Sequence, residues 1–397
     1  MFPHKIKSEA FLKTTQNMSL YHQPTTDAPW DLPNGARDIV KSIAAEQILH
    51  EMLADKLEHA HDLEEDALED LVINYPGVCQ RKFSFDPKEG RKARMFYPLS
   101  MLLHLNPPLH TVETFARAYP KALDEQNPLM IACKHNASLD VVKFLLTEIP
   151  NAIHEPMAKL NVYPLHWSCR KGNPEVVQHL LDEYPEATRE ADRGSGCLPL
   201  HIAVAYGVPL DVIKSLYHAW PQAALERDNN GWVPLHHACR FPRDLEVVKF
   251  LVQVTPDADL VRESLAYAAS HQSIDVIEFL MQKNEQLQNP NGEDETLLAR
   301  AVTNNTADVV DFLAKQYPWM LTTPDREAGR IPLHNAIQYE ASADVVGVLI
   351  RHDPTTLICR DVNEETPLDV ARLTCADDKV VEMLETVSKN LDHFAAL

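Results

Sequence analysis

Pairs of apolar residues recur along this chain with the period of an amphipathic helix. Val141, Val142, Leu145 and Leu146 form one such quartet, and equivalent quartets follow in later stretches. Positions i, i+1, i+4 and i+5 cover about 140° of a helix with 3.6 residues per turn, so one face is predicted to be buried and the other to be free. The pattern indicates a series of short helices, each packed on one side.

The apolar helices alternate with a second element that opens on Pro-Leu. The dipeptide starts at positions 98, 128, 164, 199, 234, 332 and 367, with degenerate copies at Ser264-Leu265 and Leu297-Leu298, so successive copies lie 30 to 36 residues apart. A fixed period of this size is typical of stacked supersecondary units. We therefore expect one continuous core shared by all units rather than several globular domains.

Proline also marks where each unit ends. Tyr119-Pro120, Tyr184-Pro185 and Trp220-Pro221 are examples of a pair that closes the second helix, because a residue before proline is disfavoured in the helical region. Thirteen or fourteen residues usually separate this proline from the next Pro-Leu, enough for a hairpin-like arm with turn residues such as Asp228 to Gly231. The next unit starts only eight positions after Pro120 and after Pro256, at Pro128 and Ser264, so arms are expected to be short or missing there.

The N-terminal part of the chain differs. Residues 1–35 are polar and lack a sustained apolar period, which predicts a disordered tail. Residues 36–96 contain two helical patterns, the second ending at Tyr75-Pro76, and a longer connection from 77 to 97. We interpret them as a degenerate first repeat that caps the stack. The array then spans residues 97–397 and ends in a capping helix.

These units resemble the ankyrin repeat, a turn followed by two antiparallel helices with Thr-Pro-Leu-His opening the first. The best matches begin at Pro164, Pro199, Pro234 and Pro332, each followed by Leu-His. The resemblance implies an all-α ankyrin-repeat solenoid of about nine helix-turn-helix units with short arms. The leading Thr survives only at Thr366, so most of the usual Thr–His bonding is expected to be lost.

Composition narrows the function. The net charge of −21 disfavours nucleic acid and anionic membranes as partners. No apolar run is long enough to span a membrane and no secretory signal is recognisable, so the expected compartment is the cytoplasm, with the nucleus as the other possibility. The chain is also expected to be a monomer. Cys133, Cys169 and Cys239 fall in the small-residue position of three first helices and are interpreted as core thiols.

No motif for catalysis, cofactor binding or metal binding is evident in the sequence. His166, His201, His236 and His334 occur once per repeat. Packed helices lie about 8–10 Å apart, so these histidines are not expected to converge on one metal ion. We interpret each as stabilising its own turn, and the pair His236-His237 as incidental. The sequence predicts a protein without enzymatic activity, cofactor or metal.

The resemblance implies that partner proteins bind in the groove formed by the arm tips and the ends of the first helices. Arginine and aromatic residues are enriched at interface hot spots, which favours the following candidate residues: Lys134, His135, Arg170, Lys171, Tyr206, Asn229, Asn230, Trp232, Arg240 and Phe241. A scaffold or adaptor that binds an acidic, extended protein segment is the leading hypothesis. A structural or self-associating spacer with no groove ligand is the alternative, and an unrecognised enzyme is the weakest hypothesis.

Overall fold

A computed structural model describes residues 44–50, 52–53, 65–85, 94–157, 159–241, 243–283, 297–304, 306–325 and 328–395. The predicted tail, residues 1–35, lies outside them, and so does most of the helix predicted before residue 60. Contacts divide the chain into two compact units, one of Met1–Pro98 with Arg117–Tyr119 and one of Leu99–Ala116 with Pro120–Leu397. Each unit is described by itself.

The first unit is mainly helical where it is described. Residues 44–50 and 52–53 are helical, and α3 (Glu65–Asn74) buries Leu68, Leu71 and Val72. This helix stops just before Tyr75-Pro76, as predicted, and η1 (Pro76–Gln80) follows. The connection after it was predicted without any strand, since the fold class was all-α. It contains instead two short antiparallel strands, β1 (Phe83–Phe85) and β2 (Arg94–Phe96), with Phe83 opposite Phe96.

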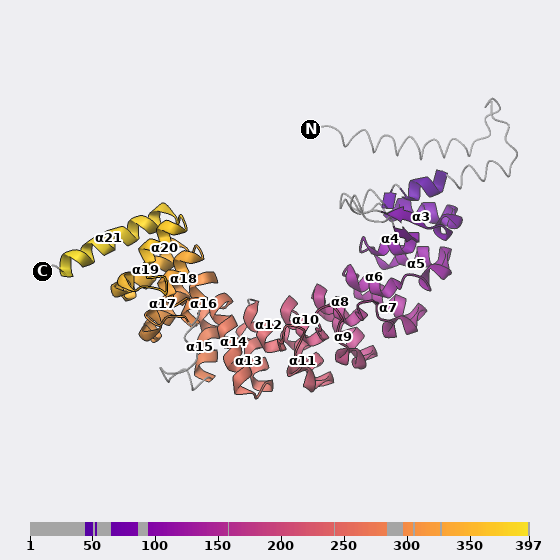
Figure 1. The fold of residues 1–397 in the computed structure, drawn as a ribbon. Helices are drawn as coiled ribbons and strands as arrows, with labels where there is room; N and C mark the ends of the chain where they lie inside the picture. The colour runs from indigo at the N-terminus through magenta and orange to yellow at the C-terminus, as the bar shows by residue number, and fades with distance from the viewer. Residues whose placement is uncertain are drawn as a thin grey trace, which may run out of the picture. The chain divides into compact units, whose positions relative to one another are not determined.

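The second unit is a stack of helix pairs (Figure 1). The first helices of the pairs are α4 (Pro98–Leu103), α6 (Pro128–Lys134), α8 (Pro164–Lys171), α10 (Pro199–Tyr206), α12 (Pro234–Arg240), α14 (Ala258–His271), α16 (Leu297–Asn304), α18 (Pro332–Gln338) and α20 (Pro367–Leu373). The second helices are α5 (Leu109–Ala118), α7 (Leu139–Glu148), α9 (Pro174–Glu183), α11 (Leu210–Ala219), α13 (Leu245–Val254), α15 (Ile274–Lys283), α17 (Ala307–Gln316), α19 (Ala343–His352) and α21 (Asp378–Ala395). From α6 to α20, each first helix contacts the next first helix, so the fold is a helical solenoid.

The helix boundaries follow the proline rules read from the sequence. Each complete Pro-Leu copy starts a first helix. Where a residue-proline pair follows a second helix, the helix ends directly before that pair, as at Glu183 before Tyr184-Pro185. The proline then opens a short 3-10 helix. These are η2 (Pro120–Leu123), η3 (Pro150–His154), η4 (Pro185–Arg189), η5 (Pro221–Ala224), η7 (Pro318–Leu321) and η8 (Pro354–Ile358).

The arms are turns closed by backbone hydrogen bonds. The Asp228 amide donates to the Trp232 carbonyl at 2.9 Å, and the Asn229 amide donates to Ser195 of the preceding arm, also at 2.9 Å. Neighbouring arms are thereby joined. After Pro256 no arm forms, because α14 begins at Ala258, as the short spacing predicted. This helix starts earlier than its degenerate Ser264-Leu265 copy indicated.

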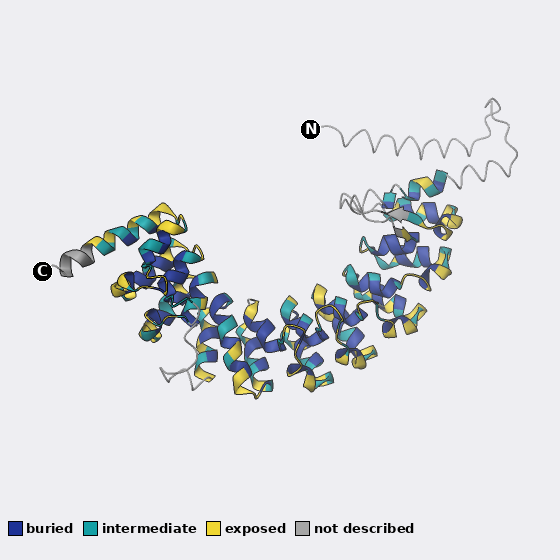
Figure 2. Ribbon diagram, in the orientation of Figure 1, coloured by how far each residue is buried: buried dark blue, intermediate teal, exposed yellow. Residues whose placement is uncertain are grey.

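The core lies between the two helix layers (Figure 2). Val141, Val142 and Leu145 of the first quartet are fully buried, and each such side chain contributes about 1.5–3 kcal/mol. Cys133, Cys169 and Cys239 are buried free thiols in the first helices, which confirms them as core residues. Burial raises the pKa of the Cys133 and Cys239 thiols to about 12.

Candidate protein-binding surface

The histidines near the start of the first helices hold adjacent repeats together. The Leu198 amide donates to Nδ1 of His201 at 3.2 Å, so Nε2 carries the proton. Nε2 then donates to the Glu226 carbonyl of the next arm at 3.0 Å and contacts the Trp232 carbonyl at 3.2 Å. His166 repeats this arrangement with the Tyr163 amide and the Glu190 carbonyl. The loss of Thr–His bonding expected from the sequence is therefore only partial. The backbone amide at the Thr position still donates to the histidine, although the Thr side chain is absent.

Burial keeps these rings neutral. His166 and His201 are 1% and 0% exposed, and burial lowers the pKa of each to about 4. Neutral imidazole can accept one hydrogen bond and donate another, which is what the junction between two repeats requires. The interpretation that each histidine stabilises its own turn is confirmed for His166 and His201, which also bond the following repeat. Nδ1 of His334 has no hydrogen-bond partner among the described residues, so His334 bonds the next arm, through the Glu365 carbonyl, but not its own turn.

His236 shows what the missing arm changes. Its Nδ1 accepts from the Val233 amide at 3.1 Å as in the other repeats. No arm follows Pro256, and Nε2 of His236 lies 3.4 Å from a carboxylate oxygen of Glu263 in α14. The two groups are close enough for an ion pair, but their geometry does not give a hydrogen bond. The same histidine therefore faces a helix where its equivalents face an arm carbonyl.

The ends of the same helices carry cations stacked on aromatic rings. The Arg170 guanidinium lies 5.5 Å from the centre of the Trp167 ring and 5.1 Å from that of Tyr206 in the next repeat. Lys134 of the preceding repeat places its Nζ 5.4 Å from the Trp167 ring. Arg170 and Tyr206 are exposed, while Trp167 and Lys134 are half-buried. Three consecutive repeats thus build one alternating row of cations and rings.

A second group continues the alternation in the next repeat. The Arg240 guanidinium lies 5.4 Å from the Trp232 ring, and Trp232 packs edge-on against Tyr267 of α14. Arg243 lies over the exposed Phe241 ring at 5.9 Å. Its guanidinium also donates to the carbonyls of Val204 and Ala205 at the end of α10. Arg243 therefore links the second group to the first.

We call the following residues the cation–aromatic surface: Lys134, Trp167, Arg170, Tyr206, Trp232, Arg240 and Phe241. Six of them belong to the predicted set. Trp167 was missed, although its sequence signal existed: it lies three residues before Arg170, a spacing that places two helical side chains together. Arg243 and Tyr267 could not be found this way, because their contacts cross between repeats.

The remaining predicted residues are His135, Lys171, Asn229 and Asn230, and two of them, His135 and Asn229, make side-chain contacts within the protein. The His135 ring lies 4.3 Å from that of His104. Burial, His104, Lys134 and Lys171 lower the His135 pKa to about 4, so this residue adds no positive charge at neutral pH. Asn229 donates from its side chain to the Gly194 carbonyl of the preceding arm at 3.3 Å. Lys171 and Asn230 are exposed.

The stacked helix pairs and joined arms define a helical-repeat protein. Comparison with known families agrees: the model described as ankyrin repeats, three copies, matches residues 101–191 and 165–263. The chain is an ankyrin repeat protein, and such repeats are generally protein–protein interaction modules. None of the curated proteins compared with the chain matches it. Within the described residues, no helix combines the length and the apolar character needed to cross a bilayer.

Proposed function

We propose that this protein is a non-catalytic scaffold that binds an acidic, extended segment of a partner protein through the cation–aromatic surface. The observation that carries the proposal is Arg170, which is exposed and stacked between two rings on a chain of net charge −21. A guanidinium held by rings keeps its N–H donors available for a carboxylate, often through two parallel bonds. Stacking also restricts the side chain before binding, which reduces the entropy lost in the complex.

The neighbouring residues supply charge and contact area. Lys134 and Arg240 extend the positive charge over repeats on either side of Arg170, while Tyr206 and Phe241 expose ring surface between them, 49% and 38% respectively. Charge complementarity accelerates association, and buried aromatic anchors slow dissociation. An extended acidic segment with apolar side chains between its carboxylates fits this alternation.

A charge-reversal variant tests the proposal. Arg170→Glu combined with Arg240→Glu changes the net charge from −21 to −25, since each substitution changes it by −2. Peptides selected by the wild-type protein from a random display library should be rich in Asp and Glu. The double variant should bind those peptides at least about 100-fold more weakly, with each lost charge pair costing about 1.5–3 kcal/mol.

The matched control is Lys143→Glu with Lys379→Glu, which has the same net charge but alters exposed residues of second helices. It should retain affinity, and binding by the wild type should weaken as salt screens the charges. Equal weakening in both double variants would attribute the effect to net charge alone. If no peptide is enriched, the spacer alternative is favoured, and size-exclusion chromatography with light scattering will show whether the chain self-associates.

A further inference from the structure

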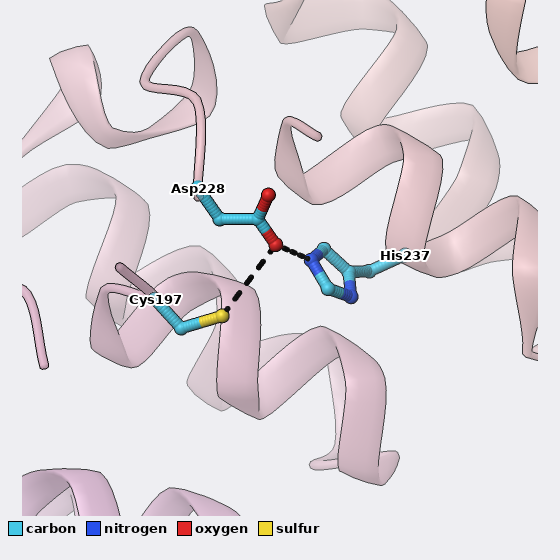
Figure 3. A group of neighbouring side chains, drawn as sticks. All are labelled: Cys197, Asp228 and His237. Atoms are coloured by element: carbon cyan, nitrogen blue, oxygen red, sulfur yellow. Dashed lines mark hydrogen bonds and ion pairs between the residues drawn. The ribbon is translucent and has the colours of Figure 1, made fainter. Parts of the chain in front are cut away.

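Three side chains with metal-binding groups meet between two adjacent repeats (Figure 3). Cys197 precedes α10, Asp228 lies in the following arm, and His237 belongs to α12. Nε2 of His237 is 3.0 Å from Oδ2 of Asp228, and Sγ of Cys197 is 3.7 Å from the same oxygen. All three ligand atoms lie within 4.8 Å of one another.

These separations suit a single zinc ion. Zinc bonds of about 2.0–2.3 Å at tetrahedral angles place neighbouring ligand atoms about 3.3–3.7 Å apart. The sulfur-to-oxygen distance falls at the upper end of that range, and the nitrogen-to-oxygen distance is a few tenths of an ångström shorter. Thiolate, imidazole and carboxylate together are a ligand set that zinc accepts.

The fold orients the groups before any ion binds. Oδ1 of Asp228 accepts from the amides of Asn230 at 2.8 Å and Trp232 at 2.9 Å, which turns Oδ2 toward the other two side chains. The His237 ring packs against the rings of Trp232 and Phe241. Its Nδ1 has no hydrogen-bond partner among the described residues, so Nε2 is the nitrogen that the ring presents to the cluster.

Equivalent aspartates elsewhere in the array show which groups usually donate to this carboxylate oxygen. Oδ2 of Asp325 receives the side-chain amide of Asn335, which occupies the position of His237 in its own repeat. Oδ2 of Asp361 receives Arg330, which stands two residues before its proline as Cys197 does. In both cases the oxygen accepts from an N–H group, which is not a zinc ligand. At Asp228 both positions carry metal ligands.

Charge favours a cation here. The Asp228 side chain is 0% exposed, and a buried carboxylate needs compensation. The amides of Asn230 and Trp232 and the neutral His237 ring donate hydrogen bonds to this carboxylate but bring no formal positive charge. A divalent ion bound by one carboxylate and one thiolate gives a site of zero net charge. Its ligands would come from both sides of a repeat junction, so binding would hold the two repeats together.

We propose that Cys197, Asp228 and His237 bind one zinc ion, with the fourth coordination position open to water. The ion would cross-link the repeat that begins at Pro199 to the one that begins at Pro234. This inference does not depend on the groove function, because it concerns the junction and not the partner.

The test uses the full chain, reduced and freed of metal with a chelator, and titrated with Zn²⁺ and separately with Co²⁺. Cobalt reports its ligands by visible absorption, and a thiolate ligand adds a charge-transfer band. We expect one ion per chain and a rise in the unfolding temperature with Zn²⁺. Cys197→Ser and His237→Asn should each weaken binding by more than about 100-fold, since even residues that merely orient ligands are worth about 10–100-fold.

The His237→Asn variant is designed to fold, because Asn335 makes the corresponding bond to its aspartate. Cys375→Ser, which alters an exposed thiol, is the control and should bind zinc like the wild type. If the wild-type chain takes up no ion at one equivalent, the cluster is a hydrogen-bonded core and the proposal is wrong. It is equally wrong if the two ligand variants bind zinc as tightly as the wild type.

Discussion

The first helices of this ankyrin repeat protein carry basic side chains in two regions that behave in opposite ways. In α8, His166 is 1% exposed and bonded on both ring nitrogens, whereas Arg170 of the same helix is exposed and stacked on rings. The two residues are only four positions apart, about 6 Å along the helix axis. Their difference is therefore set by position along the helix and not by which face they occupy.

The arms explain the contrast. Carbonyls of Glu190 and Glu226 in the arms accept from His166 and His201, so the arms cover the beginnings of the first helices. The opposite ends remain open, and there a permanently charged guanidinium is tolerated because water still reaches it. The comparison separates a buried row that holds repeats together from an exposed row available for a partner.

The largest expected effect is a loss of stability at low pH, caused by the buried row of histidines. His166 and His201 have pKa values of about 4 in the folded protein against an ordinary value of about 6.5. Between these values the unfolded chain binds protons that the folded chain does not, so stability falls as the pH drops from about 6.5 to 4. Each ring contributes about 3 kcal/mol to this loss.

Urea unfolding at a series of pH values measures the effect. The double variant His166→Gln with His201→Gln should show a flatter dependence over the same range, because it lacks two of the buried histidines whose pKa values are lowered. An unchanged slope in the double variant would assign the acid sensitivity to other residues.

Removing one buried ring should have the next largest effect. His201→Ala leaves the Leu198 amide and the Glu226 carbonyl without their partner and opens a cavity, which should cost about 2–4 kcal/mol. Tyr206→Ala, in the exposed row of the same helix, should cost less than about 0.5 kcal/mol. Hydrogen exchange along α10 and denaturant unfolding report both values. Similar losses for the two variants would contradict the division into rows.

A conservative change in the exposed row should have a smaller effect, visible only in binding. Arg170→Lys keeps the charge but loses the planar stacking on Trp167 and Tyr206, which is worth about 1 kcal/mol. Acidic peptides should therefore bind about 5-fold more weakly, with the same salt dependence and unaltered stability. Unchanged affinity, measured by fluorescence anisotropy, would show that charge alone serves at this position.

Asn229 should give the smallest effect and tests where the binding surface ends. Its side chain bonds the preceding arm, so Asn229→Ala should lower the free energy of unfolding by less than about 1 kcal/mol. Peptide affinity should stay the same. A large loss of affinity with normal stability would instead place Asn229 among the contact residues.

Much of the architecture followed from local sequence rules. Apolar quartets, Pro-Leu starts and proline ends placed the helices, and the eight residues after Pro256 predicted the missing arm. The strand pair of Phe83–Phe85 and Arg94–Phe96 was not predicted, because two three-residue strands carry too little periodicity to detect. In the proposed cation–aromatic surface, Arg170 and Tyr206 were chosen individually, but Trp167, the other ring on which Arg170 stacks, was not.

The repeat period, the helix boundaries and the candidate contact residues can be read from the amino-acid sequence, because each depends on patterns within one unit. Tertiary structure alone decided how side chains from different repeats meet. Arg170 reaches Tyr206, Arg243 reaches the end of α10, and Asp228 brings His237 and Cys197 together. These residues are as many as 40 positions apart, and their proximity depends on the stacking of one helix pair on the next, which no local pattern encodes.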